Sequence, residues 1–146
     1  MFSRFEYTLK QTGFVIERFG SAFADWDAFA TERLQPKLNG IHNPTFVAAR
    51  TLLLSDPPKR QIKDKHAGKW HWDPATPQRN GESDAQYLLR LVRNVRNNLF
   101  HGGKYPEGPV MDSQLRDRQL LEACLNVIGE CCSLDSGFRD VFDETH

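Results

Sequence analysis

The distribution of proline and glycine is the feature of this sequence that most limits its fold. All eight prolines and most of the ten glycines lie between residues 36 and 109 of the 146-residue chain. Proline ends helices and glycine favours turns, so an irregular middle region is predicted, with helices before and after it. A chain of this length has room for one well-packed core. We therefore expect a single domain spanning residues 1–146.

The first part of the chain has apolar residues at helical spacing. Over residues 3–34 they recur three, four or seven positions apart, the pattern of an amphipathic helix. These residues are Phe5, Leu9, Ile16, Phe19, Phe23, Trp26 and Ala30. Gly13 and Gly20 could kink or break this helix, and Pro36 ends it. A short helix over residues 44–54 is predicted after the pair Asn43-Pro44.

The middle of the chain, residues 59–82, shows no helical period. Its sequence, "KRQIKDKHAGKWHWDPATPQRNGE", predicts a long irregular loop with one short hairpin strand at residues 69–72. A loop of this length in a compact domain is usually functional or mobile. Part of it could also bind RNA, because Lys59, Arg60, Lys63 and Trp70 combine positive charge with a stacking surface. A loop packed around tryptophan anchors is at least as consistent with the same residues.

Two further helices are predicted after this loop. Ser83 or Asp84 caps the first, which runs to about Phe100 and ends at a glycine pair. The second begins near Asp112 and continues until Gly137. Its inward-facing residues are expected to be Leu115, Leu121, Cys124, Leu125, Ile128, Cys131 and Cys132. The fold class is therefore predicted to be all-α, a bundle of four to five helices around a long irregular loop.

The charge and the cysteine content argue against some classes of binding site. Lys and Arg total 19 and Asp and Glu total 19, so no global positive field attracts nucleic acid, and an anion site must come from local clustering. The three cysteines lack the spacing of a zinc site and are expected to be buried thiols in a reducing compartment. No signal peptide or membrane-spanning segment is apparent. We expect a soluble cytoplasmic protein that needs no metal or other cofactor.

The helix predicted over residues 85–101 has an unusual polar face. On a helix turning about 100° per residue, one apolar face would be buried and a polar stripe would lie opposite. The apolar face comprises Leu88, Leu91, Val92, Val95 and Leu99, and the stripe comprises Arg90, Arg93, Asn97 and His101, with Arg96 at its edge. Leu89 and Phe100 form a second apolar strip that could pack against another copy of the helix.

Arg96 and His101 are residue types suited to phosphoryl transfer in RNA. Arginine offers a planar, permanently charged fork for a phosphate, and histidine can take or give a proton near neutral pH. Asn97 adds a hydrogen-bond donor for the charge that develops on the phosphate. A purely structural interpretation competes with this one, because exposed arginines are usually solvated and a histidine suits a helix C-terminus. Glu6 could face Arg93 or Arg96, although a solvated position is the simpler expectation.

The segment "RNNLFHGGK", from Arg96 to Lys104, resembles the signature of the HEPN family of small helical bundles. The specific match covers about a dozen residues. The resemblance implies a HEPN-like bundle acting as a metal-independent endoribonuclease, in a toxin or in defence against phage. It gives Arg96 the phosphate and transition-state role, His101 the proton transfer and Asn97 a supporting role. From the helical geometry, Arg93 and Lys104 are further candidates for binding flanking phosphates.

The same resemblance implies a homodimer in which two copies of the motif form one composite active site on RNA. A nucleotidyltransferase-like antitoxin is a possible partner. Two alternatives stay open at this stage. One is a non-catalytic HEPN-type module that binds a nucleotide or a partner protein, and the other is a structural bundle whose polar helix is a dimer interface.

Overall fold

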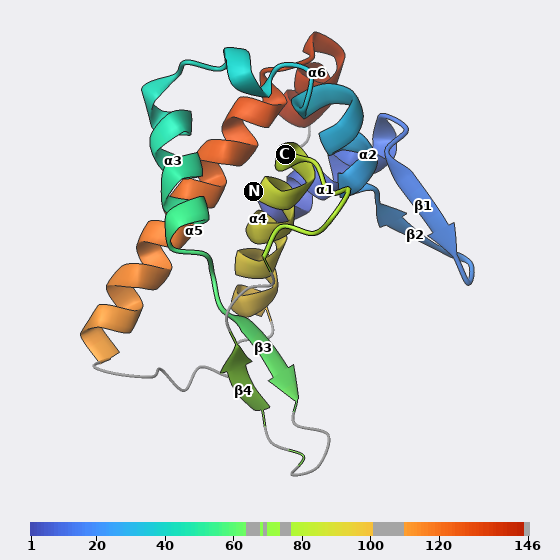
Figure 1. The fold of residues 1–146 in the computed structure, drawn as a ribbon. Coiled ribbons are helices and arrows are strands. Elements are labelled where there is room, and N and C mark those ends of the chain that lie inside the picture. Colours follow the sequence, from blue (N-terminus) through green and yellow to red (C-terminus); the bar gives the residue numbers. More distant parts are fainter. Residues whose placement is uncertain (64–67, 69, 74–76, 101–109, 145–146) are drawn as a thin grey trace.

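The computed structural model describes residues 1–63, 68, 70–73, 77–100 and 110–144. Over these residues the chain is mostly helical, with six α-helices and two small antiparallel sheets of two strands each (Figure 1). None of the helices in this part of the chain has an apolar stretch of membrane-spanning length. The predicted helical character is thus confirmed, but the fold is not a plain bundle of four to five helices.

The predicted single helix over residues 3–34 is wrong. It is divided into α1 (Phe2–Gln11), the hairpin strands β1 (Val15–Arg18) and β2 (Ser21–Ala24), and α2 (Trp26–Phe29). The division has a local cause: Gly13, Phe19 and Gly20 all have positive φ, which no right-handed helix allows. Positive φ at two consecutive residues between paired strands is what a type I′ turn requires.

The connection from α2 to the next long helix is made of short turns. A π-helical turn, η1 (Ala30–Leu34), continues α2, and a 3₁₀ turn, η2 (Leu38–Gly40), follows it. The helix α3 (Pro44–Ser55) then begins as predicted, because the Asn43 side chain accepts a hydrogen bond of 3.0 Å from the Thr45 backbone nitrogen.

The segment 59–82 is more ordered than the predicted irregular loop. It contains a second hairpin, with β3 (Arg60–Lys63) paired to β4 (Trp70–Asp73). The strand expected at residues 69–72 is present one residue later, and its partner strand was not predicted. Short β-hairpins lack the length for a clear alternating pattern, which explains why the charged first strand was missed.

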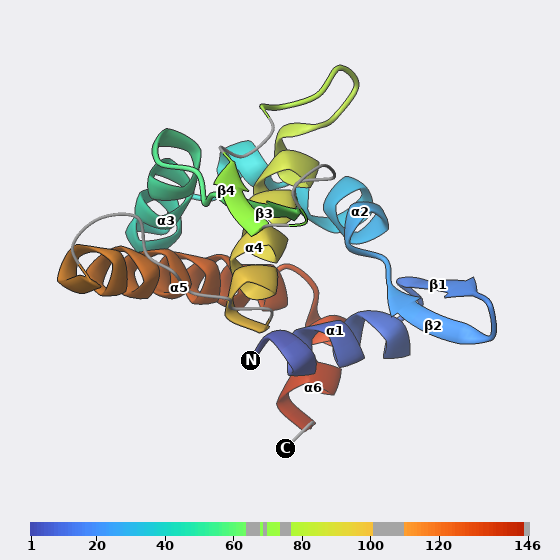
Figure 2. The same cartoon turned by 90° about the horizontal axis from the view of Figure 1, so that it is seen from below.

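The helix α4 (Asp84–Phe100) occupies the centre of the molecule (Figures 1 and 2). Its start matches the prediction and is fixed by a reciprocal cap. The Ser83 hydroxyl accepts from the Gln86 backbone nitrogen at 3.1 Å, and the Gln86 side chain accepts from the Ser83 nitrogen at 3.0 Å. Gln35, far away in sequence, accepts from the Ala85 nitrogen at 2.9 Å. These contacts satisfy backbone donors that the first turn of a helix leaves without partners.

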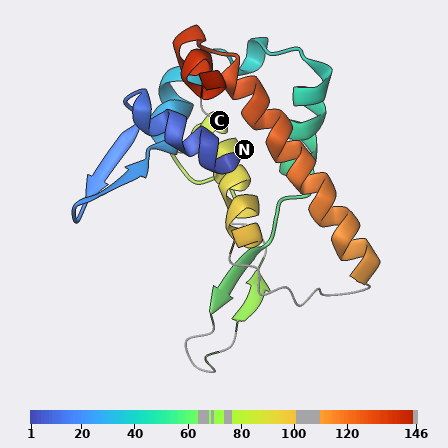
Figure 3. The same cartoon turned by 180° about the vertical axis from the view of Figure 1, so that it is seen from behind.

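The C-terminal region forms two helices instead of the predicted one, α5 (Val110–Cys132) and α6 (Ser136–Glu144). Asp135 accepts a hydrogen bond of 3.0 Å from the Phe138 backbone nitrogen and so begins α6. Arg4 of α1 donates to the Phe142 carbonyl at 2.6 Å and lies over its ring, which attaches α6 to α1. Leu115 was expected to face inward, but it is 55% exposed because the start of α5 extends beyond the core (Figure 3).

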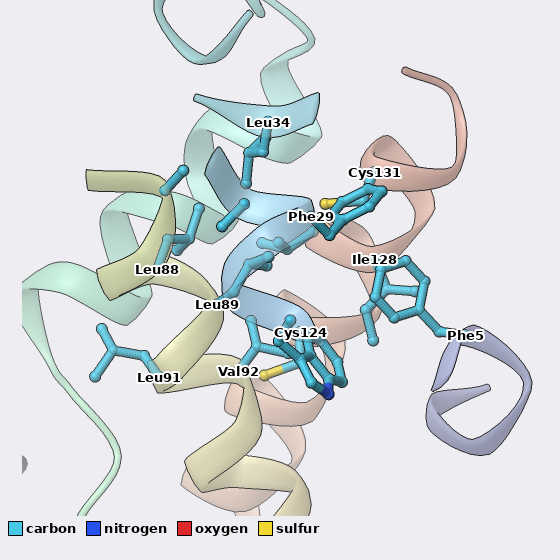
Figure 4. Close-up of a cluster of buried hydrophobic side chains, with 14 of the residues drawn as sticks. Phe5, Phe29, Leu34, Leu88, Leu89, Leu91, Val92, Cys124, Ile128 and Cys131 are labelled. Carbon is cyan, nitrogen blue, oxygen red and sulfur yellow. The ribbon is translucent and has the colours of Figure 1, made fainter. Parts of the chain in front are cut away.

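The core is built around α4 by side chains from every α-helix (Figure 4). Leu88, Leu91, Val92 and Val95 are buried as predicted. Leu89 was expected on a surface strip, yet it is 1% exposed and packs in the same core. It therefore cannot contact a second copy of the chain, while the side chains of Leu99 and Phe100 lie outside the described part of the structure.

The buried cysteines lead to a first prediction. Burial raises the pKa of Cys124 and of Cys132 to about 12, and it raises the pKa of Cys131 as well. The native thiols are therefore expected to react with Ellman's reagent at least about 100-fold more slowly than those of protein unfolded in urea, since only the thiolate attacks. The unfolded protein is the control, and a thiol that reacts equally fast in both states would contradict the assignment.

The turn of the first hairpin leads to a second prediction. Phe19 has φ of 53°, a left-handed conformation that destabilises the folded state for most residues. Its side chain is fully exposed, so no burial of the ring offsets this effect. Phe19→Asn is expected to stabilise the protein by about 1 kcal/mol, because asparagine tolerates this conformation.

Thermal unfolding followed by circular dichroism measures this effect, with an expected rise in Tm of about 3 °C. Phe23→Asn is the matched control, since Phe23 is an exposed phenylalanine in the adjacent strand without positive φ. A larger rise in the control than in the turn variant would contradict the explanation.

Candidate functional site

The candidate site lies along the last turns of α4. The first half of this helix is enclosed by the core, but toward its C-terminal end the helix lies beside α1 and the β3–β4 hairpin (Figure 3). Arg93, Arg96 and Asn97 all belong to this end. His101 and Lys104, which the resemblance and the geometry included, lie outside the described residues.

Arg96 is held by two neighbouring side chains. Its Nε lies 2.8 Å from Oε1 of Glu6, which α1 brings across from the far end of the sequence. Its Nη1 donates to Oδ1 of Asn97 at 3.1 Å. The Arg96 side chain is 33% exposed and that of Glu6 is 19% exposed. Arg96 is therefore an oriented cation and not a freely solvated one.

The contact between Glu6 and Arg96 is inaccessible to solvent at its centre. Oε1 of Glu6 and Nε of Arg96 are both buried, and they meet as an ion pair without the alignment of a good hydrogen bond. Burying both groups costs solvation energy that their mutual attraction offsets. The expectation that Glu6 is simply solvated is thus wrong, and the other expectation for this residue, that it faces Arg96 across the bundle, is confirmed.

Arg90 does not join Arg96 in a continuous polar stripe. Its Nε and Nη2 each lie 2.9 Å from a carboxylate oxygen of Glu82, Nη2 also donates to the Pro77 carbonyl at 3.1 Å, and its guanidinium lies over the Tyr87 ring. The hydrogen bonds from Arg90 lower the pKa of Glu82, and the same pair raises the pKa of Arg90. Arg90 therefore fastens the turn that precedes α4.

Arg93 lies between these two arginines and is half-buried. It lies on α4 one turn before Arg96 and Asn97, and its role in binding a flanking phosphate stays a prediction. The structure thus brings together Arg93, Arg96 and Asn97 from the predicted set, and it adds Glu6 to them.

The second hairpin lies beside the C-terminal end of α4 (Figures 1 and 3). Asn98 of α4 donates a hydrogen bond of 2.7 Å to the carbonyl of Lys59, just before β3. Lys59 has an exposed side chain, whereas the side chains of Arg60, Lys63 and Trp70 lie outside the described residues. In the backbone register Lys63 is paired with Trp70. The role of Asn98 was not predicted, because nothing in the sequence indicates which of three nearby asparagines contacts a distant carbonyl.

Comparison with known proteins gives no relative: no family model, no curated protein and no solved structure matches this chain. Within the described residues, no group of three or more His, Cys, Asp or Glu side chains could hold a metal ion. The site is thus defined by its own residues, namely Arg96 with Glu6 and Asn97 in contact and Arg93 one turn away.

The Glu82–Arg90 pair leads to a third prediction. Glu82→Gln is expected to lower the free energy of unfolding at pH 7 by about 2 kcal/mol, because it leaves a largely buried guanidinium without its charged partner. Since the pKa of Glu82 is lower in the folded protein than its ordinary 4.5, the unfolded chain takes up the proton first as the pH falls. The stability difference should therefore be complete well above pH 4.5 and should disappear as the pH falls through the lowered pKa.

Urea unfolding of wild type and variant from pH 7 to pH 3 measures this difference. Asp143→Asn is the matched control, because the Arg139–Asp143 pair is an exposed i,i+4 contact of 3.5 Å that contributes little. A Glu82→Gln effect that is no larger than the control, or that grows on acidification, would contradict the assignment.

Proposed function

We propose that this protein is a metal-independent endoribonuclease of the HEPN type, acting through Arg96 and His101. The observation that carries the proposal is the fixed position of Arg96, half-buried between Glu6 and Asn97, five residues before the histidine of the motif. A solvated surface arginine would have no such partners. An arginine oriented in this way is the kind of preorganised cation that stabilises charge developing on a phosphate.

In the proposed reaction the 2′-hydroxyl of one nucleotide attacks the adjacent phosphorus. The hydroxyl gives up its proton, the new P–O2′ bond forms, and the P–O5′ bond breaks as the leaving oxygen takes a proton. His101 serves one of these proton transfers, and Arg96 contacts the phosphate oxygens. The products are a 2′,3′-cyclic phosphate and a 5′-hydroxyl, and the step needs no metal.

The proposal includes a homodimer with a composite active site, and a role as a toxin or in phage defence held in check by an antitoxin. These parts rest on the resemblance of "RNNLFHGGK" to the family motif. The apolar strip of Leu89 and Phe100 was the reason from the sequence to expect a dimer, but Leu89 is buried in the core. A dimer of this kind would therefore use the polar face of α4, where Arg93, Arg96 and Asn97 lie.

A second candidate is a non-catalytic module that binds a nucleotide or a partner protein through the same face. One observation favours it: the Glu6 carboxylate already neutralises the charge of Arg96, which weakens the attraction of this end of α4 for a polyanion. Such a module would bind its ligand through Arg96 without turnover.

The test is cleavage of labelled single-stranded RNA and of total tRNA by purified protein in excess EDTA. Wild type is expected to leave 2′,3′-cyclic phosphate ends. Arg96→Ala and His101→Ala are each expected to lose at least about 100-fold in rate while keeping the wild-type circular dichroism spectrum, because each removes a group that acts in the transition state.

Arg118→Ala is the matched control, since Arg118 is an exposed arginine on α5 and should leave the rate unchanged. Cleavage that persists in His101→Ala would indicate a contaminating nuclease and contradict the proposal. Binding of RNA or a nucleotide by folded wild type, without any cleavage, would favour the second candidate.

A further inference from the structure

We infer that Glu6 is a positioning residue, which holds Arg96 from the protein side so that its outer nitrogens can meet an RNA phosphate. This inference rests on the proposed function and adds to it a residue that no part of the motif contains. Glu6 lies ninety positions before Arg96 in the chain, and only the packing of α1 beside α4 brings the two together (Figure 2).

The position of the contact on the guanidinium supports this role. Glu6 meets Nε, the nitrogen next to the aliphatic stem, and this nitrogen is inaccessible to solvent. The exposed third of the Arg96 side chain therefore belongs to other atoms. Nη1 donates to Oδ1 of Asn97, which is itself exposed, so this outer nitrogen is directed toward a residue at the surface.

The same geometry decides between two opposite effects of a carboxylate on a catalytic arginine. A carboxylate at the outer nitrogens would occupy the place of the phosphate and inhibit the enzyme. The contact of Glu6 is made at Nε instead, through a carboxylate oxygen that is inaccessible to solvent. A guanidinium has five N–H donors in a fixed plane, so fixing the Nε edge also fixes the direction of the outer edge.

The role of Glu6 is tested with Glu6→Gln, which keeps the shape of the side chain and removes its charge, and with Glu6→Asp, which keeps the charge. We expect Glu6→Gln to lower kcat about 10- to 100-fold with little change in KM, because misdirecting a catalytic group affects the transition state more than binding. Glu6→Asp should recover part of this loss. Glu17→Gln, which removes an exposed carboxylate from β1, is the control and should match wild type.

A spectroscopic measurement shows whether the effect passes through Arg96. The Nε–H resonance of Arg96, assigned by its absence in Arg96→Lys, is expected to be protected from exchange in wild type and to exchange rapidly in Glu6→Gln. A 2′-O-methyl RNA oligonucleotide, which cannot be cleaved, should shift this resonance in wild type. A folding defect alone would change the whole spectrum and not this signal selectively.

The outcomes separate this inference from the ribonuclease proposal. If Glu6→Gln cleaves faster than wild type, Glu6 obstructs the site and the positioning role is wrong. If Glu6→Gln loses the protected resonance but cleaves normally, the role is also wrong. If wild type does not cleave, yet the oligonucleotide shifts Arg96 in wild type and not in Glu6→Gln, the ribonuclease proposal fails and the positioning of Arg96 for a phosphate stands. If the oligonucleotide leaves Arg96 unmoved in a wild type that does not cleave, both are wrong.

Discussion

The burial of α4 on more than one side is the constraint on which the rest of this structure depends. Consecutive residues such as Leu88 and Leu89, and again Leu91 and Val92, are all fully buried, so the helix is enclosed by α2, η1, α3 and α5 together. Each buried side chain of this size contributes about 1.5–3 kcal/mol. Among the side chains that the structure describes on α4, Val95 is the last buried one, and the partly or fully exposed Arg96 and Asn97 follow it.

The same constraint separates two arginines that look equivalent in the sequence. Arg90 lies where α4 is still enclosed, so its fork is matched by both oxygens of Glu82, by a backbone carbonyl and by an aromatic ring. Such a complete environment is typical of a structural ion pair. Arg96 lies nearer the C-terminal end of α4, and its ion pair with Glu6 is made through Nε, at the inner edge of the guanidinium. Arg90 thus holds the turn before α4 in place, whereas Arg96 is a partly exposed cation that Glu6 and Asn97 orient.

Several features that depend on residues close together in the sequence were predicted, whereas features that depend on distant residues were not. The limits of α3 and α4 were predicted because each depends on a cap within three residues of the helix start, Asn43 for α3 and Ser83 for α4. The first hairpin was missed because the apolar spacing over residues 3–34 also fits a helix, and positive φ at Phe19 could not be inferred from a residue type that rarely adopts it. The burial of Leu89 depends on packing partners far along the chain. The end of α5 at Cys132 and the start of α6 at Ser136, which Asp135 caps, were missed. For the candidate site, the α4 residues were predicted from helical geometry, whereas the contact with Glu6 required the placement of α1.

The position of the site at the end of a helix makes the direction of Arg96 more important than its charge. The last turn of α4 carries the negative end of the helix dipole, and Glu6 adds a full negative charge beside it. Both disfavour an approaching phosphate, and the chain as a whole, with 19 basic and 19 acidic residues, supplies no compensating field. Long-range attraction therefore cannot hold RNA at this place. A phosphate can be held only by short, directed contacts, in which a charge-assisted hydrogen bond gains most when its donor already points at the acceptor. The Glu6 carboxylate thus weakens the long-range attraction between Arg96 and a phosphate. In the proposed reaction it strengthens the short contact between them, because it fixes the direction of the guanidinium.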